Sequence, residues 1–260
     1  MSAFATRVGR SAITAGLQAA DVYRLFARTL YYVFRGRRSR GATLEQLYLI
    51  GNKSLFFMTT VMGFLGMITV FQAGLQLERV VPDTSQLGAS FAELLVRNFA
   101  PDIGAMMLAT RVGAGIAAEI GSMAVTEQLD ALRMSAADPI DFLVVPRFLA
   151  SLVMTAVLVI WGAAVAEGVG LLTGWSVFDI RPGTFFNLMM VDVGDVVVGL
   201  AKCFAYGAAI PLLSAHMGLR AYGGSEGVGS ATTNAVVASS FAVIVLNAII
   251  SAAGFLVFPQ

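Results

Sequence analysis

Long apolar segments dominate this chain, and its charged residues gather in the short stretches between them. The clearest apolar segments cover about 55–77, 142–174, 196–219 and 235–258. Each reaches the ~20 residues that a helix needs to cross a bilayer, where the backbone can find hydrogen-bond partners only within the protein. Only 13% of the residues are charged, against about a quarter in soluble domains. The chain is therefore predicted to be an all-α integral membrane protein.

A further apolar stretch, residues 87–122, is too long for one simple crossing. Pro101 lies inside it, and a proline removes a backbone N–H that the interior of a helix needs. We therefore expect a partly embedded outer helix, a kink at Pro101, and a second span over about 101–121. The chain then has five transmembrane helices.

The N-terminal part of the chain is predicted to lie along the membrane rather than to cross it. Within residues 11–34 apolar side chains are interspersed with polar ones, and Arg24 and Arg28 lie one helical turn apart. This pattern is typical of an interfacial amphipathic helix, with an ordinary cytosolic helix as the alternative. We assign residues 1–46 to this helix and a basic cytoplasmic flank, and residues 47–260 to a five-span membrane domain. The flank contains Arg35, Arg37, Arg38 and Arg40.

The distribution of basic residues predicts the orientation, because cytoplasmic loops carry an excess of lysine and arginine. Only Arg79 and Arg181 fall in the expected external segments, which also hold Asp179, Asp192 and Asp195. We therefore expect a cytoplasmic N-terminus, an external C-terminus, and a cytoplasmic Gly/Ser/Thr loop over 222–233. The basic residues in the expected cytoplasmic segments, besides the N-terminal arginines, are Lys53, Arg133, Arg147 and Arg220.

A charged segment, residues 119–133, follows the second span. Glu127, Asp130 and Arg133 suit a short amphipathic helix over about 125–135, and such charges are costly inside hydrocarbon. The helix is therefore expected at the cytoplasmic face, where a soluble partner can reach it.

Four charged residues are expected within the spans, where ionisable side chains usually face a protein interior or an aqueous cavity. Arg111 and Glu119 lie two turns apart, and they could also pair locally near the inner face. Glu167 and Lys202 are expected in the outer half, facing each other or a polar cavity.

Small residues also recur at every fourth position of the second span, where they allow a second helix to approach closely. The contact is expected either within one subunit or with a helix that slides. The stripe consists of Ala105, Ala109, Gly113, Ala117 and Gly121.

The sequence offers no nucleotide-hydrolysing or metal site. Residues 224–230 loosely resemble a phosphate loop but lack its lysine. Cys203 and His216 are single residues of their kinds, which leaves no set of metal ligands. We expect a non-enzymatic chain that binds no cofactor of its own, so that any ATP is hydrolysed by another chain.

Several motifs resemble those of the MlaE/YrbE permeases of Mce-associated ABC transporters. The resemblance covers about residue 47 to the C-terminus, and its central part is highly specific. The motifs are Arg111-Val112-Gly113-Ala114-Gly115, Glu119-Ile120-Gly121, Thr126-Glu127-Gln128-Leu129-Asp130-Ala131-Leu132, Asp138-Pro139, Val145-Pro146-Arg147, and Gly223-Gly224-Ser225-Glu226-Gly227-Val228-Gly229.

The resemblance implies a permease subunit in the bacterial inner membrane that moves phospholipids, or related lipids, between the inner and outer membranes and so affects outer-membrane lipid asymmetry. It implies a permease dimer, here expected to be a homodimer, with a cytosolic ATPase dimer that binds ATP and Mg. An Mce-domain ring would lie on the external side, and no nucleic acid is expected.

The resemblance also implies roles for particular residues. Leu129 and Leu132 would enter a hydrophobic notch of the ATPase, with charged residues pairing at its rim. Arg97 would suit a lipid phosphate, because a guanidinium donates two parallel hydrogen bonds. The implied coupling residues are Glu127, Gln128, Leu129, Asp130, Leu132 and Arg133, and the implied substrate-cavity residues are Phe71, Gln72, Leu75, Leu94, Leu95, Arg97 and Asn98.

Two positions depart from the family pattern. Asn98 stands where many relatives have glutamate, which removes a possible partner of Arg97, and Asn234 stands where relatives often have a basic residue. Two other classes of function stay open from sequence: an ion-driven secondary lipid carrier using Glu167 and Lys202, and a non-transporting scaffold that anchors an Mce ring.

Overall fold

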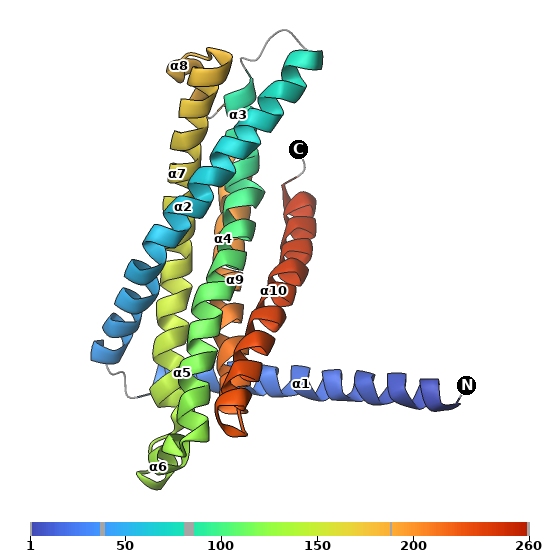
Figure 1. Ribbon diagram of the computed structural model, residues 1–260, viewed down its shortest axis with the longest axis vertical. Helices are drawn as coiled ribbons and strands as arrows, with labels where there is room; N and C mark the ends of the chain where they lie inside the picture. The colour runs from blue at the N-terminus through green and yellow to red at the C-terminus, as the bar shows by residue number, and fades with distance from the viewer. Residues whose placement is uncertain (1, 37–39, 81–85, 188, 259–260) are drawn as a thin grey trace.

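The computed structural model describes residues 2–36, 40–80, 86–187 and 189–258, and the described chain contains helices and no strands. Five of its helical segments are long and apolar enough to cross a membrane, which confirms the predicted all-α fold with five transmembrane helices. They stand side by side as an elongated bundle (Figure 1). The segments are Gly41–Arg79, Leu87–Val125, Ile140–Phe178, Val193–Leu219 and Gly224–Val257.

The first helix, α1 (Ser2–Arg35), lies across one end of the bundle, nearly perpendicular to the spanning helices (Figure 1). Leu25 and Thr29 are buried, while Tyr23 and Phe34 on other faces are exposed. This arrangement suits the predicted interfacial helix. Arg37 and Arg38 of the predicted basic flank lie outside the described residues.

The longest helix, α2 (Arg40–Val80), packs against α7 (Val145–Phe178). The two helices come so close that a Cβ on Gly66 would overlap the backbone carbonyl of Ala166. The predicted boundary between residues 46 and 47 falls inside α2, since the helix continues through its polar N-terminal turns before it reaches the apolar stretch.

The second span is one continuous helical run over Leu87–Val125, so the predicted division into an outer helix and a separate span at Pro101 is wrong. A π-helical turn ends at Phe99, and Pro101 then lies in the first turn of the next helix, a position that tolerates proline. A second π-helical turn follows further along. The run consists of α3 (Leu87–Leu94), η1 (Leu95–Phe99), α4 (Ala100–Leu108), η2 (Ala109–Gly113) and α5 (Ala114–Val125).

The last two spans are α9 (Val193–Leu219) and α10 (Gly224–Val257), and the turn between them is short. The predicted loop over 222–233 is therefore wrong, because α10 already begins at Gly224. Gly223 and Gly224 adopt φ angles of 86° and 75°, which glycine reaches without strain. This sharp turn lets the small polar residues that follow enter the helix.

The small-residue stripe of the second span packs inside the subunit, as one of its two interpretations predicted. All five of its members are buried. Gly113 faces Ser214 of α9 and Ser239 of α10, and Gly218 of α9 approaches the carbonyl of Ala117. The stripe therefore brings α9 and α10 against the second span.

Candidate functional site

A short helix, α6 (Gln128–Met134), projects from the same end of the bundle at which α1 lies (Figure 1). Glu127 precedes it with a φ of 61°, which turns the chain sharply after α5. Asp130 and Arg133 form an ion pair at 2.9 Å, and both side chains are more than 60% exposed. Gln128 is exposed as well. The predicted short, charged helix is thus present, with its polar residues open to solvent.

The apolar side of α6 differs from the prediction. Leu129 is only 5% exposed and packs inside the chain, so it is not available to a partner in this conformation. Leu132 is half-buried and lines a surface cavity of about 350 Å³ with Met123 and Phe142. Met134 is 87% exposed. The prediction was wrong for Leu129 because the sequence did not show which face of so short a helix meets α5.

The segment after α6 is tied to α1 by Asp138. Its Oδ2 accepts hydrogen bonds from Arg28 Nη2 at 2.9 Å and Tyr32 Oη at 2.7 Å, and its Oδ1 accepts one from the Ile140 N–H at 2.9 Å. Partial burial opposes ionisation, but these bonds and the Arg28 charge outweigh it and lower the pKa of Asp138. The hydrogen bond to the Asp138 carboxylate raises the pKa of Tyr32. Sequence analysis missed this contact, which joins residues about a hundred positions apart.

A polar cluster lies toward the opposite end of the bundle, where η1 and α4 meet α9. Arg97 Nη1 pairs with Asp195 Oδ1 at 2.9 Å, and both side chains are largely buried. Asp195 was predicted in an external loop, but it lies in the first turn of α9, where its Oδ2 also accepts a hydrogen bond from the Asp192 N–H at 3.0 Å. This acid supplies the partner that Arg97 was expected to lack.

Lys202 forms the other half of the cluster. Its Nζ donates to Asn98 Oδ1 at 2.8 Å and to the carbonyl oxygen of Arg97 at 3.1 Å, and it lies 3.5 Å from Asp102 Oδ2. That carbonyl is free to accept because Pro101, its usual helical partner four residues later, has no N–H. Tyr206 Oη donates to Asp102 Oδ1 at 2.8 Å. The cluster therefore holds two positive and two negative groups in a connected network.

Glu167 and Lys202 were expected to face each other or a polar cavity, and the first of these alternatives, a direct contact, is wrong. Lys202 is engaged by the polar cluster, and both carboxylate oxygens of Glu167 are buried without a hydrogen-bond partner among the described residues. Similar depth in the two spans did not establish that they face each other.

The predicted substrate-cavity residues divide into three groups. Phe71, Gln72, Leu75 and Leu94 are exposed on the outward surface of α2 and α3. Leu95 is only 1% exposed and cannot line a cavity in this conformation. Arg97 and Asn98 are held by the polar cluster, so a ligand reaching them would compete with existing contacts.

Arg111 and Glu119 are not brought together, although they share a helical run. Arg111 Nη1 donates to Ser54 Oγ of α2 at 2.7 Å. Glu119 Oε2 pairs with Arg147 Nη2 of α7 at 2.9 Å, and Arg147 is almost fully buried. Each charge therefore ties the second span to a different neighbouring helix.

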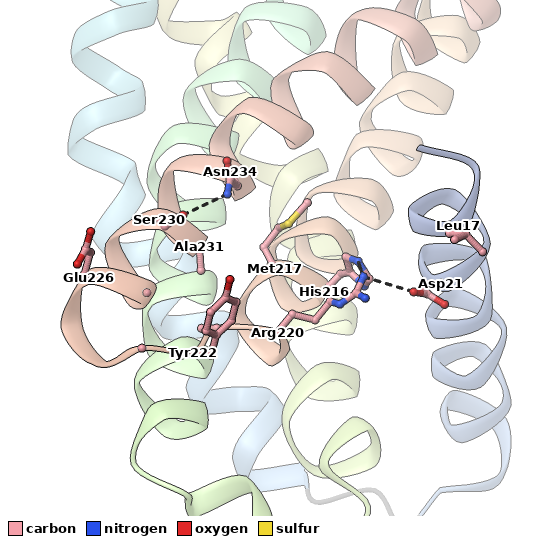
Figure 2. A pocket seen from close by; sticks show the side chains of 13 residues that line it. Leu17, Asp21, His216, Met217, Arg220, Tyr222, Glu226, Ser230, Ala231 and Asn234 are labelled. Carbon is pink, nitrogen blue, oxygen red and sulfur yellow. Dashed lines mark hydrogen bonds and ion pairs between the residues drawn. The ribbon is translucent and has the colours of Figure 1, made fainter. Parts of the chain in front are cut away.

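A cavity of about 640 Å³ lies where α1 meets the end of α9 and the start of α10 (Figure 2). Asp21 of α1 points toward Arg220, and the two pair at 3.3 Å. Arg220 also lies 3.3 Å from His216 Nε2, so the single histidine of the chain takes part in a polar contact. Asn234, which departs from the family pattern, lines this cavity beside Ser230.

Five spanning helices, a helix across one end of them and a short charged helix at that same end define a multi-pass membrane protein. Residues 43–253 match the family model described as Permease MlaE, and the chain belongs to this family.

The chain is also similar to proteins named as probable ABC transporter permeases. One from Synechocystis is 36% identical over 229 residues, which cover 87% of each chain. One from Rickettsia bellii is 34% identical over 210 residues, covering 80% of this chain and 81% of the relative. The chloroplastic protein TRIGALACTOSYLDIACYLGLYCEROL 1 of Arabidopsis thaliana is 32% identical over 225 residues, covering 84% of this chain and 63% of that protein. The chain is thus a permease subunit of an ABC transporter, which implies an ATPase partner.

Proposed function

We propose that this permease subunit moves phospholipids, or related lipids, between the inner and outer membranes, driven by a separate cytosolic ATPase that binds ATP and Mg. The observation that carries the proposal is the position of α6, a short exposed helix beyond the end of the spans. Its exposed ion pair and its half-buried Leu132 offer a polar rim and an apolar centre to a partner, which is the usual anatomy of a protein interface.

The outer end of the chain supports a lipid as the substrate. Phe71, Leu75 and Leu94 present large apolar side chains on α2 and α3, and Leu94 lies three positions before the cationic Arg97. Acyl chains would contact the apolar side chains. A lipid phosphate would replace the Asp195 carboxylate as the partner of the Arg97 guanidinium. Both are oxygen anions that can accept two parallel hydrogen bonds from an arginine.

In the proposed cycle, ATP binding closes the ATPases and pushes on α6 of two permease copies. The movement reaches α1 through Asp138, which fixes the chain after α6 to that helix, and it reaches the spanning helices through Glu119 and Arg147, which join α5 to α7. The substrate cavity between the copies then narrows and releases the lipid. ATP must supply the difference in lipid affinity between the open and narrowed states.

The remaining partners are proposed on the basis of family membership. The protein would form a homodimer in the bacterial inner membrane, with the N-terminus cytoplasmic and an Mce-domain ring on the external side. Exposed apolar residues along α10, among them Val237, Phe241 and Ile244, leave a surface that a second copy or lipid can cover.

Charge reversal on α6 tests the coupling role. Asp130→Lys should leave folding and lipid binding intact, because Asp130 is exposed and its side chain pairs only with Arg133 among the described residues. Like-charge contacts at an interface cost several kcal/mol, so ATP-driven transport in proteoliposomes should fall by about tenfold or more. Glu226→Lys, an exposed acid in the first turn of α10, is the matched control. Normal transport by Asp130→Lys would reject α6 as the coupling helix.

A further inference from the structure

A further cavity lies in the half of the bundle nearer to α6, between α2 and the second span. Its volume is about 240 Å³, and it opens beside the N-terminal half of α2. Gly115 forms part of its wall, where a Cβ would meet no atom within 4 Å. It is separate from the predicted substrate cavity near Arg97. Its principal lining residues are Gln46, Ile50, Lys53, Arg111, Gly115 and Glu119.

Two cations of this cavity lack an acidic partner. Arg111 donates one hydrogen bond, to the buried Ser54, and neither it nor Lys53 forms an ion pair within the described parts of the chain. A guanidinium has five N–H donors, so most of those on Arg111 are left for a ligand. An uncompensated cation within a membrane span is costly, and such residues usually mark a binding site or an ion path.

The one acid of the cavity does not cancel these charges. Glu119 is already paired with Arg147 at 2.9 Å, and that arginine is almost fully buried. The local charge is therefore positive, and the cavity favours an anion. A phosphate oxygen would accept hydrogen bonds from both Arg111 and Lys53, and the Gln46 amide would add a neutral donor.

The depth of the cavity identifies the source of the anion. Arg111 lies eight residues before Glu119, or about 12 Å further along the helix axis. Gly121, just after Glu119, contacts Ala221, whose neighbour Arg220 pairs with Asp21 of α1. The level of α1 is thus near Glu119, and Arg111 lies about two turns deeper. Exposed Phe56 and Phe57 on α2 flank Lys53 with apolar area suited to acyl chains.

We propose that this cavity binds the phosphate of a phospholipid drawn from the cytoplasmic leaflet, with Arg111 and Lys53 as its ligands. This second lipid site goes beyond the proposed function, because it does not depend on ATP or on the direction of transport. It would hold a lipid headgroup deeper in the membrane than α1, part of the way from the cytoplasmic leaflet to the proposed substrate cavity near Arg97.

The test is native mass spectrometry of the delipidated full-length protein in detergent, titrated with dioleoyl phosphatidylglycerol. Lys53→Gln and Arg111→Gln should each weaken lipid binding by about tenfold, since each removes charged donors to the phosphate. Gly115→Leu keeps both charges but places an apolar side chain in the cavity wall, where its Cβ would meet no atom within 4 Å, and it should weaken binding similarly. Arg79→Gln, at the other end of α2, is the matched control and should bind like the original protein.

Binding of two further ligands shows whether the bound anion is a phospholipid headgroup or free phosphate. Dioleoylglycerol has the same acyl chains without a phosphate, and its binding should be weak and unchanged by Lys53→Gln. Inorganic phosphate should compete only weakly, because it lacks the acyl chains. Equal lipid binding by the control and by Lys53→Gln and Gly115→Leu would overturn the proposal. Tight binding of inorganic phosphate with no binding of lipid would overturn the assignment of the ligand as a lipid. Neither result would bear on ATP-driven transport.

Discussion

Removing the negative charge of Asp195 should destabilise the protein strongly, because this carboxylate is the only acid paired with the largely buried Arg97 in the described chain. Asp195 is 2% exposed, and Asn at this position keeps an oxygen for the Asp192 N–H but loses the ion pair. Breaking a buried pair by removing one partner costs about 3–5 kcal/mol. The 16% exposure of the Arg97 side chain allows some solvation, so we expect about 3 kcal/mol for Asp195→Asn.

The assay is reversible unfolding in mixed micelles followed by circular dichroism. Asp130→Asn breaks the exposed pair with Arg133, and such pairs contribute about 0.5 kcal/mol or less. The double variant Arg97→Gln with Asp195→Asn should be less destabilised than the sum of the single variants, because no uncompensated charge is left. If Asp195→Asn cost no more than Asp130→Asn, the buried pair would not stabilise the end of the bundle opposite α6 as described.

Three further outcomes follow from the packing and the charges. Gly66→Ala should cost about 1–3 kcal/mol by pushing α2 away from the Ala166 carbonyl, whereas Gly63→Ala, whose Cβ would lie 3.6 Å from its nearest neighbour, should be nearly neutral in the same unfolding assay. Pro101→Ala should change stability by less than about 1 kcal/mol, since the proline lies in a first helical turn; a larger loss would mean that it shapes the π-helical turn. Because the pKa of Asp138 is lowered by folding, its hold on α1 is fully present above the ordinary value of 3.8 and is lost only as the pH falls through the lower folded value. In the original protein, a spin label on the exposed face of α1 should therefore stay immobile from about pH 7 to about pH 5. In Asp138→Asn, the same label should be more mobile throughout this pH range. Equal mobility of the label in both proteins would contradict the contact between Asp138 and α1.

The features that could be predicted from sequence are local ones. Five spans and the short helix α6 follow from hydropathy and from the position of Glu127, Asp130 and Arg133, which need no knowledge of distant contacts. The closely packed stripe also follows from local spacing, because residues four apart share one face of a helix.

The features that could not be predicted depend on pairs far apart in the chain. Arg97 and Asp195 are 98 positions apart, so the sequence showed an arginine without its partner. The π-helical turn before Pro101 lets the helical run continue through a proline, which sequence rules treat as the end of a helix. Leu129 was misassigned for the same reason, since its burial depends on how α6 folds back toward the spans.

The central claim is that this permease works with an ATPase to move lipid, and native mass spectrometry of the complex gently extracted from its own host tests it most directly. The account predicts two copies of this chain, two ATPase subunits and co-purifying phospholipid, with the ATPase lost selectively in Asp130→Lys. A lone permease without ATPase, under conditions that preserve other membrane complexes, would contradict it.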